Sequence, residues 1–139
     1  SSRNDLKSFV DDIVDPIDAF VFAQFYFDME NPDDFNHEIW DKSIAINLTA
    51  PNYLIHELKN KMNAGSSIVI LTSTEGFRGS YGASAYAATK AAIHNLVKTL
   101  ANNLGKRGIR INAPTIVADG GYLCSDPLSK YEFEDTFGR

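Results

Sequence analysis

Helical and strand patterns alternate along this chain of 139 residues, and that alternation restricts the fold more than any other feature. Apolar residues recur at helical spacing in three segments, 5–14, 35–62 and 84–105. Short runs rich in apolar and β-branched residues follow them, at 17–27 (with the loop that leaves the strand), 67–72 and 109–113. Three helix–strand pairs in this order predict a single α/β domain with a parallel sheet of buried strands and helices on its faces.

Composition limits the class of partner. The net charge of −5 argues against a nucleic acid or an anionic membrane surface held mainly by charge. The single cysteine, Cys124, rules out an internal disulfide, and no cysteine cluster suggests a metal. No apolar run approaches the roughly 18 residues of a membrane span, and no secretion signal is found, so we expect no membrane partner and a cytoplasmic location. The chain does not begin with methionine, and we expect a processed chain or a piece of a longer one.

Tyr86 and Lys90 stand four positions apart near the start of the third helical segment. That spacing places both side chains on one face of a helix, one turn apart. A tyrosine is a weak acid at neutral pH, and a nearby ammonium favours the phenolate form. The pair could therefore exchange a proton with an alcohol or a carbonyl compound. The alternative interpretation is a chance pair, because two residues at a fixed spacing are common.

Two polar residues upstream are further candidates. Ser73 directly follows the strand pattern 67–72, and sites in open parallel sheets lie at the carboxyl ends of strands. Asn47 precedes Pro51 by four positions, so its carbonyl cannot receive the usual helical hydrogen bond and is available to a water or a ligand. The alternatives are that Ser73 is an ordinary turn residue and that Pro51 merely kinks a long helix.

Taken together, these features resemble the short-chain dehydrogenase/reductase family. The resemblance rests on Thr72-Ser73-Thr74 after a strand, a Gly-rich loop, Tyr86-x-x-x-Lys90, and then the strand "IRINA" at 109–113. Ser73 and Tyr86 are 13 positions apart (86 − 73), the usual spacing in that family. Upstream, "IAINLTAP" around Asn47 is similar to the family's Asn-Leu motif, and "IDAFV" at 17–21 to the strand before its Asn-Asn-Ala-Gly. The resemblance extends to about residue 119.

The resemblance implies a fold and an activity. The fold would be a Rossmann-like doubly wound parallel sheet, of which residues 1–139 form one partial domain, its central to C-terminal portion. The activity would be NAD- or NADP-dependent hydride transfer between a small-molecule alcohol and its carbonyl compound. Neither the substrate nor the choice between NAD and NADP follows from these residues.

The resemblance also implies a role for each matching residue. Tyr86 would be the general acid/base. Lys90 would favour the phenolate of Tyr86 and hold the nicotinamide ribose together with it. Ser73 would orient the substrate oxygen, and Asn47 would hold a water in a proton relay. The stretch that would face the nicotinamide includes Pro114, Thr115 and Val117.

The sequence departs from the family pattern in four places. The Gly-rich dinucleotide fingerprint is absent, and "GFRGSYG" at 76–82 lies on the substrate side. Phe22-Ala23-Gln24-Phe25 replaces Asn-Asn-Ala-Gly, and two phenylalanines there would change the shape of the cofactor slot. The segment around Pro114 is shortened, and the last strand is missing. We therefore expect a fragment or a close association with another chain, and a free sheet edge where the first strand would pair.

Two other functions remain open on the same scaffold. Halohydrin dehalogenases are similar, lack the fingerprint and use an aromatic-walled halide site, which suits Phe22 and Phe25; Lys90 does not suit it, because that family has arginine there. The other alternative is a non-catalytic scaffold or assembly subunit. In the relatives, the helices carrying Asn47 and Tyr86 pack against a second subunit, so we expect a homo-oligomer. The apolar stripes available for that interface, or for the core, are Ile39, Ile46, Ile55, Leu58 and Ile93, Leu96, Val97, Leu100.

Overall fold

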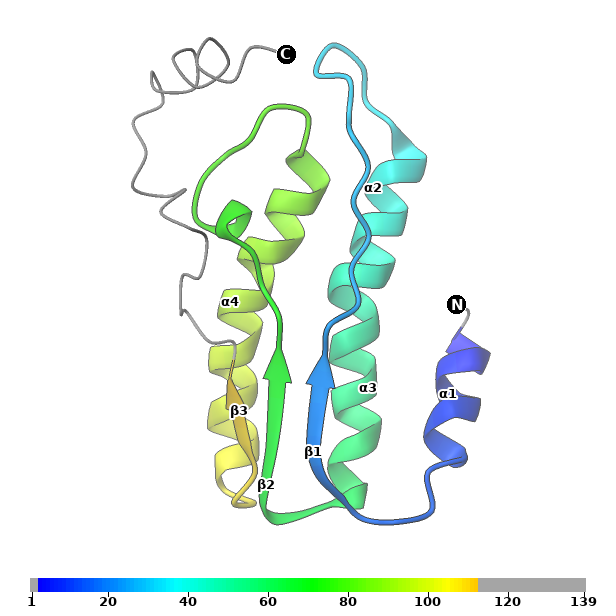
Figure 1. Ribbon diagram of the computed structural model, residues 1–139, viewed down its shortest axis with the longest axis vertical. Helices are drawn as coiled ribbons and strands as arrows, with labels where there is room; N and C mark the ends of the chain where they lie inside the picture. The colour runs from blue at the N-terminus through cyan, green and yellow to red at the C-terminus, as the bar shows by residue number, and fades with distance from the viewer. Residues whose placement is uncertain (1–2, 113–139) are drawn as a thin grey trace, which may run out of the picture.

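The computed structural model describes residues 3–112, in which helices and strands alternate as the sequence predicts (Figure 1). The helical elements are α1 (Arg3–Asp11), α2 (His37–Ser43), the π-helical η1 (Ile44–Thr49), α3 (Ala50–Leu58), the short 3₁₀ turns η2 (Lys59–Lys61) and η3 (Thr74–Gly76), and α4 (Ser84–Gly105). The strands are β1 (Ile17–Phe22), β2 (Met62–Ile70) and β3 (Arg110–Asn112). The residues Pro114, Thr115 and Val117 lie outside the described part of the chain.

The three strands form one parallel sheet in the order β1-β2-β3. This arrangement confirms the predicted α/β class. Strand β1 pairs with β2 on one side and, among the described residues, has no strand on its other side. The free sheet edge expected from the sequence is therefore present at β1.

One face of the sheet carries the core. Side chains alternate along a strand, and the residues of the sheet that pack against α3 and α4 are Phe20, Phe22, Ile68, Ile70 and Ile111. From the helices they meet Leu54, Ile55 and Leu58 of α3 and Ile93, Val97 and Leu104 of α4. The two apolar stripes that could have served a subunit interface thus mainly fill the core, with Leu96 and Leu100 partly buried against it.

The opposite face of the sheet is not covered by the described residues. Val21 is 59% exposed and Ala19 is exposed on β1, while Arg110 and Asn112 are exposed on β3. The prediction of fully buried strands is therefore correct for one face only: Ile68 and Ile70 of β2 are at most 1% exposed, but Ser67 and Val69 on its other face are half-buried, and β1 is likewise buried on one face.

The segment predicted as one helix over 35–62 consists of successive helical elements, α2, η1, α3 and η2, with the π turn η1 in the middle. Ala50 donates its backbone N–H to the carbonyl of Ala45, five residues back instead of four. Pro51 follows immediately and has no N–H to donate. The helix thus widens by one residue just before the proline, which is a frequent form of helix irregularity at functional sites.

Several boundaries also differ from the prediction, and the start of β2 and the end of α1 differ most. Strand β2 begins at Met62, five positions earlier than expected, and its pairing with β1 shifts register between Ile17 and Ala19. Helix α1 ends at Asp11, although its pattern extended to Val14, which is 91% exposed. Helix α4 ends at Gly105 as predicted.

Among residues 3–112, no helix combines the length and apolar character that crossing a membrane requires.

Candidate active site

The candidate site lies where the loops after β1 and β2 meet the first turns of α4. The carboxyl ends of β1 and β2 lie at the same end of the sheet because the strands are parallel. The loop after β1 reaches the loop before α4, where Glu30 donates its backbone N–H to the Gly82 carbonyl at 2.8 Å. Gly82 has a φ of +63°, and a Cβ there would lie 2.5 Å from the sulfur of Met29. The two loops are therefore in close contact.

Lys90 is buried beneath this junction, with only 4% of the residue exposed. Its ammonium donates a hydrogen bond to the Leu71 carbonyl, just after β2, at 3.1 Å. The same nitrogen lies 5.5 Å from the ring centroid of Tyr86, so the predicted proximity of the two side chains on α4 is confirmed. Burial lowers the pKa of the Lys90 ammonium, because desolvation disfavours its charged form.

The remaining hydrogen-bonding capacity of Lys90 faces the site. An ammonium has three N–H donors, and within residues 3–112 the Leu71 carbonyl is its hydrogen-bond acceptor. Two donors are left beside the aromatic rings of Phe25 and Tyr86. A buried cation with spare donors suits a ligand that offers adjacent hydroxyl oxygens, such as the diol of a ribose. The residues present therefore fit the ribose of a dinucleotide at this point.

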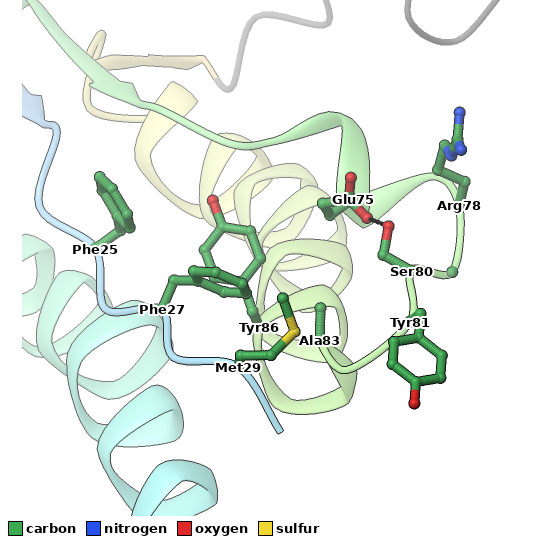
Figure 2. Close-up of a pocket in the computed structure, with 10 residues that line it drawn as sticks. Phe25, Phe27, Met29, Glu75, Arg78, Ser80, Tyr81, Ala83 and Tyr86 are labelled. Carbon is green, nitrogen blue, oxygen red and sulfur yellow. Dashed lines mark hydrogen bonds between the residues drawn. The ribbon is translucent and has the colours of Figure 1, made fainter. Parts of the chain in front are cut away.

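Tyr86 is half-buried between the loop after β1 and its own helix. Its ring makes edge contacts with Phe27 and Phe25, with centroids 5.2 Å and 6.2 Å apart. Among the described residues, no hydrogen bond engages its hydroxyl group. Figure 2 shows Tyr86 beside Phe25 and Phe27 on one side of a pocket, with Glu75 and Ser80 on the other. The phenol is thus positioned by packing while its oxygen stays available.

Ser73 is the N-cap of η3 and lies three residues after the end of β2. Its hydroxyl oxygen accepts a hydrogen bond from the Glu75 N–H at 3.2 Å, which caps this short turn. Among the described residues no group accepts its hydroxyl proton, which is thus available for donation. Turn η3 packs directly on α4, because a Cβ at Gly76 would lie 3.0 Å from the Lys90 carbonyl. The structure therefore brings Ser73 to the same end of the sheet as Lys90.

Asn47 joins three parts of the site through its side-chain amide. Its Oδ1 accepts from the Tyr26 N–H at 2.7 Å, and its Nδ2 donates to the Tyr26 carbonyl at 2.9 Å and to the Thr89 hydroxyl at 3.1 Å. Thr89 in turn donates to the Tyr86 carbonyl at 2.8 Å. Asn47 is only 2% exposed. Both N–H groups of the amide are engaged, so a water held by Asn47 would have to donate to an oxygen, either Oδ1 or the main-chain carbonyl.

A pocket of about 520 Å³ opens beside Tyr86. Its wall on the β1 side is apolar, and its other wall, from the loop before α4, includes Glu75 hydrogen-bonded to Ser80. The complete lining is Phe25, Phe27, Met29, Glu75, Arg78, Gly79, Ser80, Tyr81, Ala83 and Tyr86. A small organic substrate could reach the Tyr86 hydroxyl from this side.

Residues 3–112 contain no group of three or more His, Cys, Asp or Glu placed to hold a metal ion.

One sequence-based expectation about the site is wrong, and two contributors were missed. Phe22 does not line a slot: it is 8% exposed and packs in the core, because its side chain points to the helix-covered face. Phe25 alone of the two phenylalanines reaches Lys90. The missed residues are Thr89, which links Asn47 to Tyr86, and Glu30, which binds the start of α4. No local pattern marks Glu30, since its partner Ala85 lies 55 residues away.

Comparison with known proteins places this geometry in a family. A family profile described as enoyl-(acyl carrier protein) reductase matches residues 1–121. Human dehydrogenase/reductase SDR family member 4 is 39% identical over 88 residues, covering 60% of this chain and 32% of that protein. The uncharacterized oxidoreductase YghA of Escherichia coli is 38% identical over 102 residues, covering 73% of this chain and 34% of that protein. The chain spans about a third of the length of these curated relatives.

Solved structures show the same fold. BdcA in complex with NADPH matches with a TM-score of 0.74 and 29% identity, over 81% of this chain and 46% of that one. A short-chain dehydrogenase family protein from Francisella tularensis matches with a TM-score of 0.75 and 26% identity, over 99% of this chain and 56% of that one. The described sheet and helices therefore correspond to part of a Rossmann-fold protein.

Proposed function

Because the chain belongs to the short-chain dehydrogenase/reductase family, we propose that it carries the proton-transfer site of an NAD(P)-dependent oxidoreductase. The reaction is the interconversion of a small-molecule alcohol and its carbonyl compound. One observation carries the proposal: a buried Lys90 ammonium with spare donors lies 5.5 Å from the ring of Tyr86, beside a pocket. The NADPH bound by the related BdcA supports the choice of cofactor class.

The dinucleotide, when bound, supplies or accepts the hydride. Lys90 and Tyr86 hold it by its ribose, with Lys90 donating to the ribose hydroxyls. Pro114, Thr115 and Val117 follow β3 and are proposed to face the nicotinamide. NAD and NADP are equally compatible with these residues.

Tyr86 moves the proton. In reduction its hydroxyl donates the proton to the substrate oxygen, and in oxidation its phenolate accepts one. The nearby Lys90 ammonium stabilises negative charge on the phenolic oxygen, and the low exposure of the site strengthens that interaction. Ser73 donates its hydroxyl proton to the same substrate oxygen. The main-chain carbonyl of Asn47 holds the water through which Lys90 exchanges protons with solvent.

The helices that carry Asn47 and Tyr86 are also proposed to form a homo-oligomer interface. The faces they turn to the core are already filled. Their outward faces include Asn52 on α3 and Ala91 on α4, which are both exposed. Sedimentation equilibrium of the full chain tests this: a species of one chain mass at every concentration would contradict it.

The proposed reaction is tested by comparing Y86F with Y81F. Both substitutions remove one tyrosine hydroxyl from the same pocket, and Tyr81 is 82% exposed. NADH and NADPH binding is first followed by fluorescence titration. Turnover is then measured with a panel of ketones. We expect Y86F to lose turnover by about a hundredfold or more while still binding dinucleotide, because it removes the acid/base but leaves the ring.

We expect Y81F to retain turnover. If Y86F reduced ketones as fast as the parent chain, Tyr86 would not be the acid/base. A folded chain that bound neither dinucleotide would restrict the proposal to a longer protein containing this segment.

A further inference from the structure

Phe25 covers the ammonium of Lys90. The Lys90 nitrogen lies 5.9 Å from the Phe25 ring centroid, in the range where a cation is attracted to an aromatic face. Tyr86 stands on another side of the ammonium and the Leu71 carbonyl accepts its hydrogen bond. Two rings and one carbonyl thus surround the ammonium of Lys90, a residue that is 4% exposed.

Of these three groups, Phe25 is the one that can move aside. The Leu71 carbonyl belongs to the backbone just after β2, and Tyr86 is held in the first turn of α4. Phe25 is 55% exposed, and its ring contacts among the described residues are with Tyr86 and Lys90. Rotation of an exposed side chain is fast and costs little.

The backbone beside Phe25 is fixed, so movement is confined to its side chain. The next residue, Tyr26, has both its N–H and its carbonyl bound by the Asn47 amide. Displacing the whole loop would break these partly buried hydrogen bonds, whereas rotating the Phe25 side chain breaks neither. The Phe25 side chain can therefore uncover Lys90 while the backbone of the loop stays in place.

We propose that Phe25 gates access to Lys90. In the free protein its ring covers the ammonium, and it has to rotate away before ligand hydroxyls can bind to that ammonium. The dinucleotide part of this inference rests on the proposed function, whereas the covering of Lys90 does not. The energy of a cation–π contact is then lost on binding, so Phe25 lowers the affinity for the dinucleotide and determines how readily the site is occupied.

Phe27 provides a matched control for Phe25. It lies two positions further on in the same loop, lines the same pocket, and contacts Tyr86 with its ring edge at 5.2 Å. Within residues 3–112 the rings in cation–π contact with Lys90 are those of Phe25 and Tyr86, not that of Phe27. F25A and F27A thus remove the same group from the same loop, and they differ in whether Lys90 is uncovered.

The first measurement needs no cofactor. The rate of reductive methylation of Lys90 is followed by peptide mass spectrometry in the parent chain and the variants, with circular dichroism to verify folding. We expect F25A to raise the Lys90 rate about fivefold, the scale of a contact worth roughly 1 kcal/mol, and F27A to leave it unchanged. F25W, with a ring that attracts cations more strongly, should slow it. An equal rate in F25A and the parent would overturn the gate.

The second measurement is the dissociation constant for NADH and NADPH. We expect F25A to bind about fivefold more tightly than the parent and F25W more weakly, for the same reason. Weaker binding by F25A would mean that Phe25 is a wall contacting the ligand, and the gate would be wrong. If Lys90 reacted faster in F25A but no variant bound either dinucleotide, the gate would stand and the proposed cofactor would fail.

Discussion

The carboxylate of Glu30 accepts a hydrogen bond from the backbone N–H of Ala85 at 2.8 Å, one residue before Tyr86. It also accepts one from the Ser84 hydroxyl. The N-cap position of α4 is Ala83, whose side chain cannot bind the free N–H groups of the first turn. A carboxylate from a distant loop therefore caps the helix that carries Tyr86, and its charge is favourable at a helix N-terminus.

Removing this cap should destabilise the chain. We expect E30A to lower the free energy of unfolding by about 1 kcal/mol, the usual effect of losing a helix cap. E30Q keeps an acceptor oxygen and should lose less. Urea denaturation measures both, and D33A, in the same loop, is the control that should stay within about 0.5 kcal/mol. Equal effects of E30A and D33A would show that the cap contributes nothing.

The amide of Asn47 should contribute more to stability than any exposed polar residue of its helix. N47A deletes three hydrogen bonds and leaves the backbone groups of Tyr26 without partners. We expect a loss of about 3 kcal/mol in the free energy of unfolding. N52A, at an exposed asparagine on α3, should have little effect in the same urea titration. A loss below about 1 kcal/mol for N47A would show that these three hydrogen bonds do not stabilise the fold as expected.

His94 should make stability depend on pH below neutrality. Within residues 3–112 its Nε2 is buried without a hydrogen-bond partner, and the Phe77 ring lies against its ring at a tilt of 40° with centroids 4.3 Å apart. Burial, followed by the charge of Lys98, lowers the pKa of His94. The unfolded chain then binds this proton more readily than the folded one, so the free energy of unfolding rises with pH between the lowered pKa and the ordinary value of about 6.5.

This dependence can be isolated by substitution. Urea midpoints between pH 5 and pH 8 should fall on the acid side for the parent chain, and H94L should flatten that part of the curve. H37Q, at an exposed histidine, should keep it. An unchanged curve in H94L would assign the acid sensitivity to other groups.

Gly82 should tolerate no side chain. Its φ of +63° disfavours other residues, and a Cβ would lie 2.8 Å from the Glu30 carbonyl as well as against Met29. We expect G82A to cost at least about 1 kcal/mol and to displace the wall of the pocket. G79A, in the same loop, is the control, because a Cβ there meets nothing within 4 Å. Thermal melts compare the two, and equal midpoints would contradict the close contact.

The sequence predicted the parts of this molecule that depend on local periodicity. A spacing of four places two residues on one face of any helix, so the proximity of Tyr86 and Lys90 followed directly. The alternation of helix and strand patterns likewise predicted the parallel sheet.

Features that depend on contacts between distant segments did not follow from the pattern. Phe22 and Phe25 have the same local character, yet one belongs to a strand that fixes its direction and the other to the loop beyond. The cap supplied by Glu30 requires the loop after β1 to meet α4, which no periodicity encodes. The π turn adds a residue to a helix without interrupting its apolar character.

The extra residue of the π turn corrects the direction in which the later turns of the helix face. Each residue of an α-helix advances the chain by about 100° around the axis, so one residue added within a turn rotates all that follows by that amount. Upstream of the correction, Ile39 and Ser43 are buried; downstream, Leu54 and Leu58 are. The π turn at Ile44–Thr49 lies between these two stripes and rotates the second about the helix axis relative to the first. In the resulting arrangement Asn47 binds Tyr26, while Leu54 and Leu58 pack in the core.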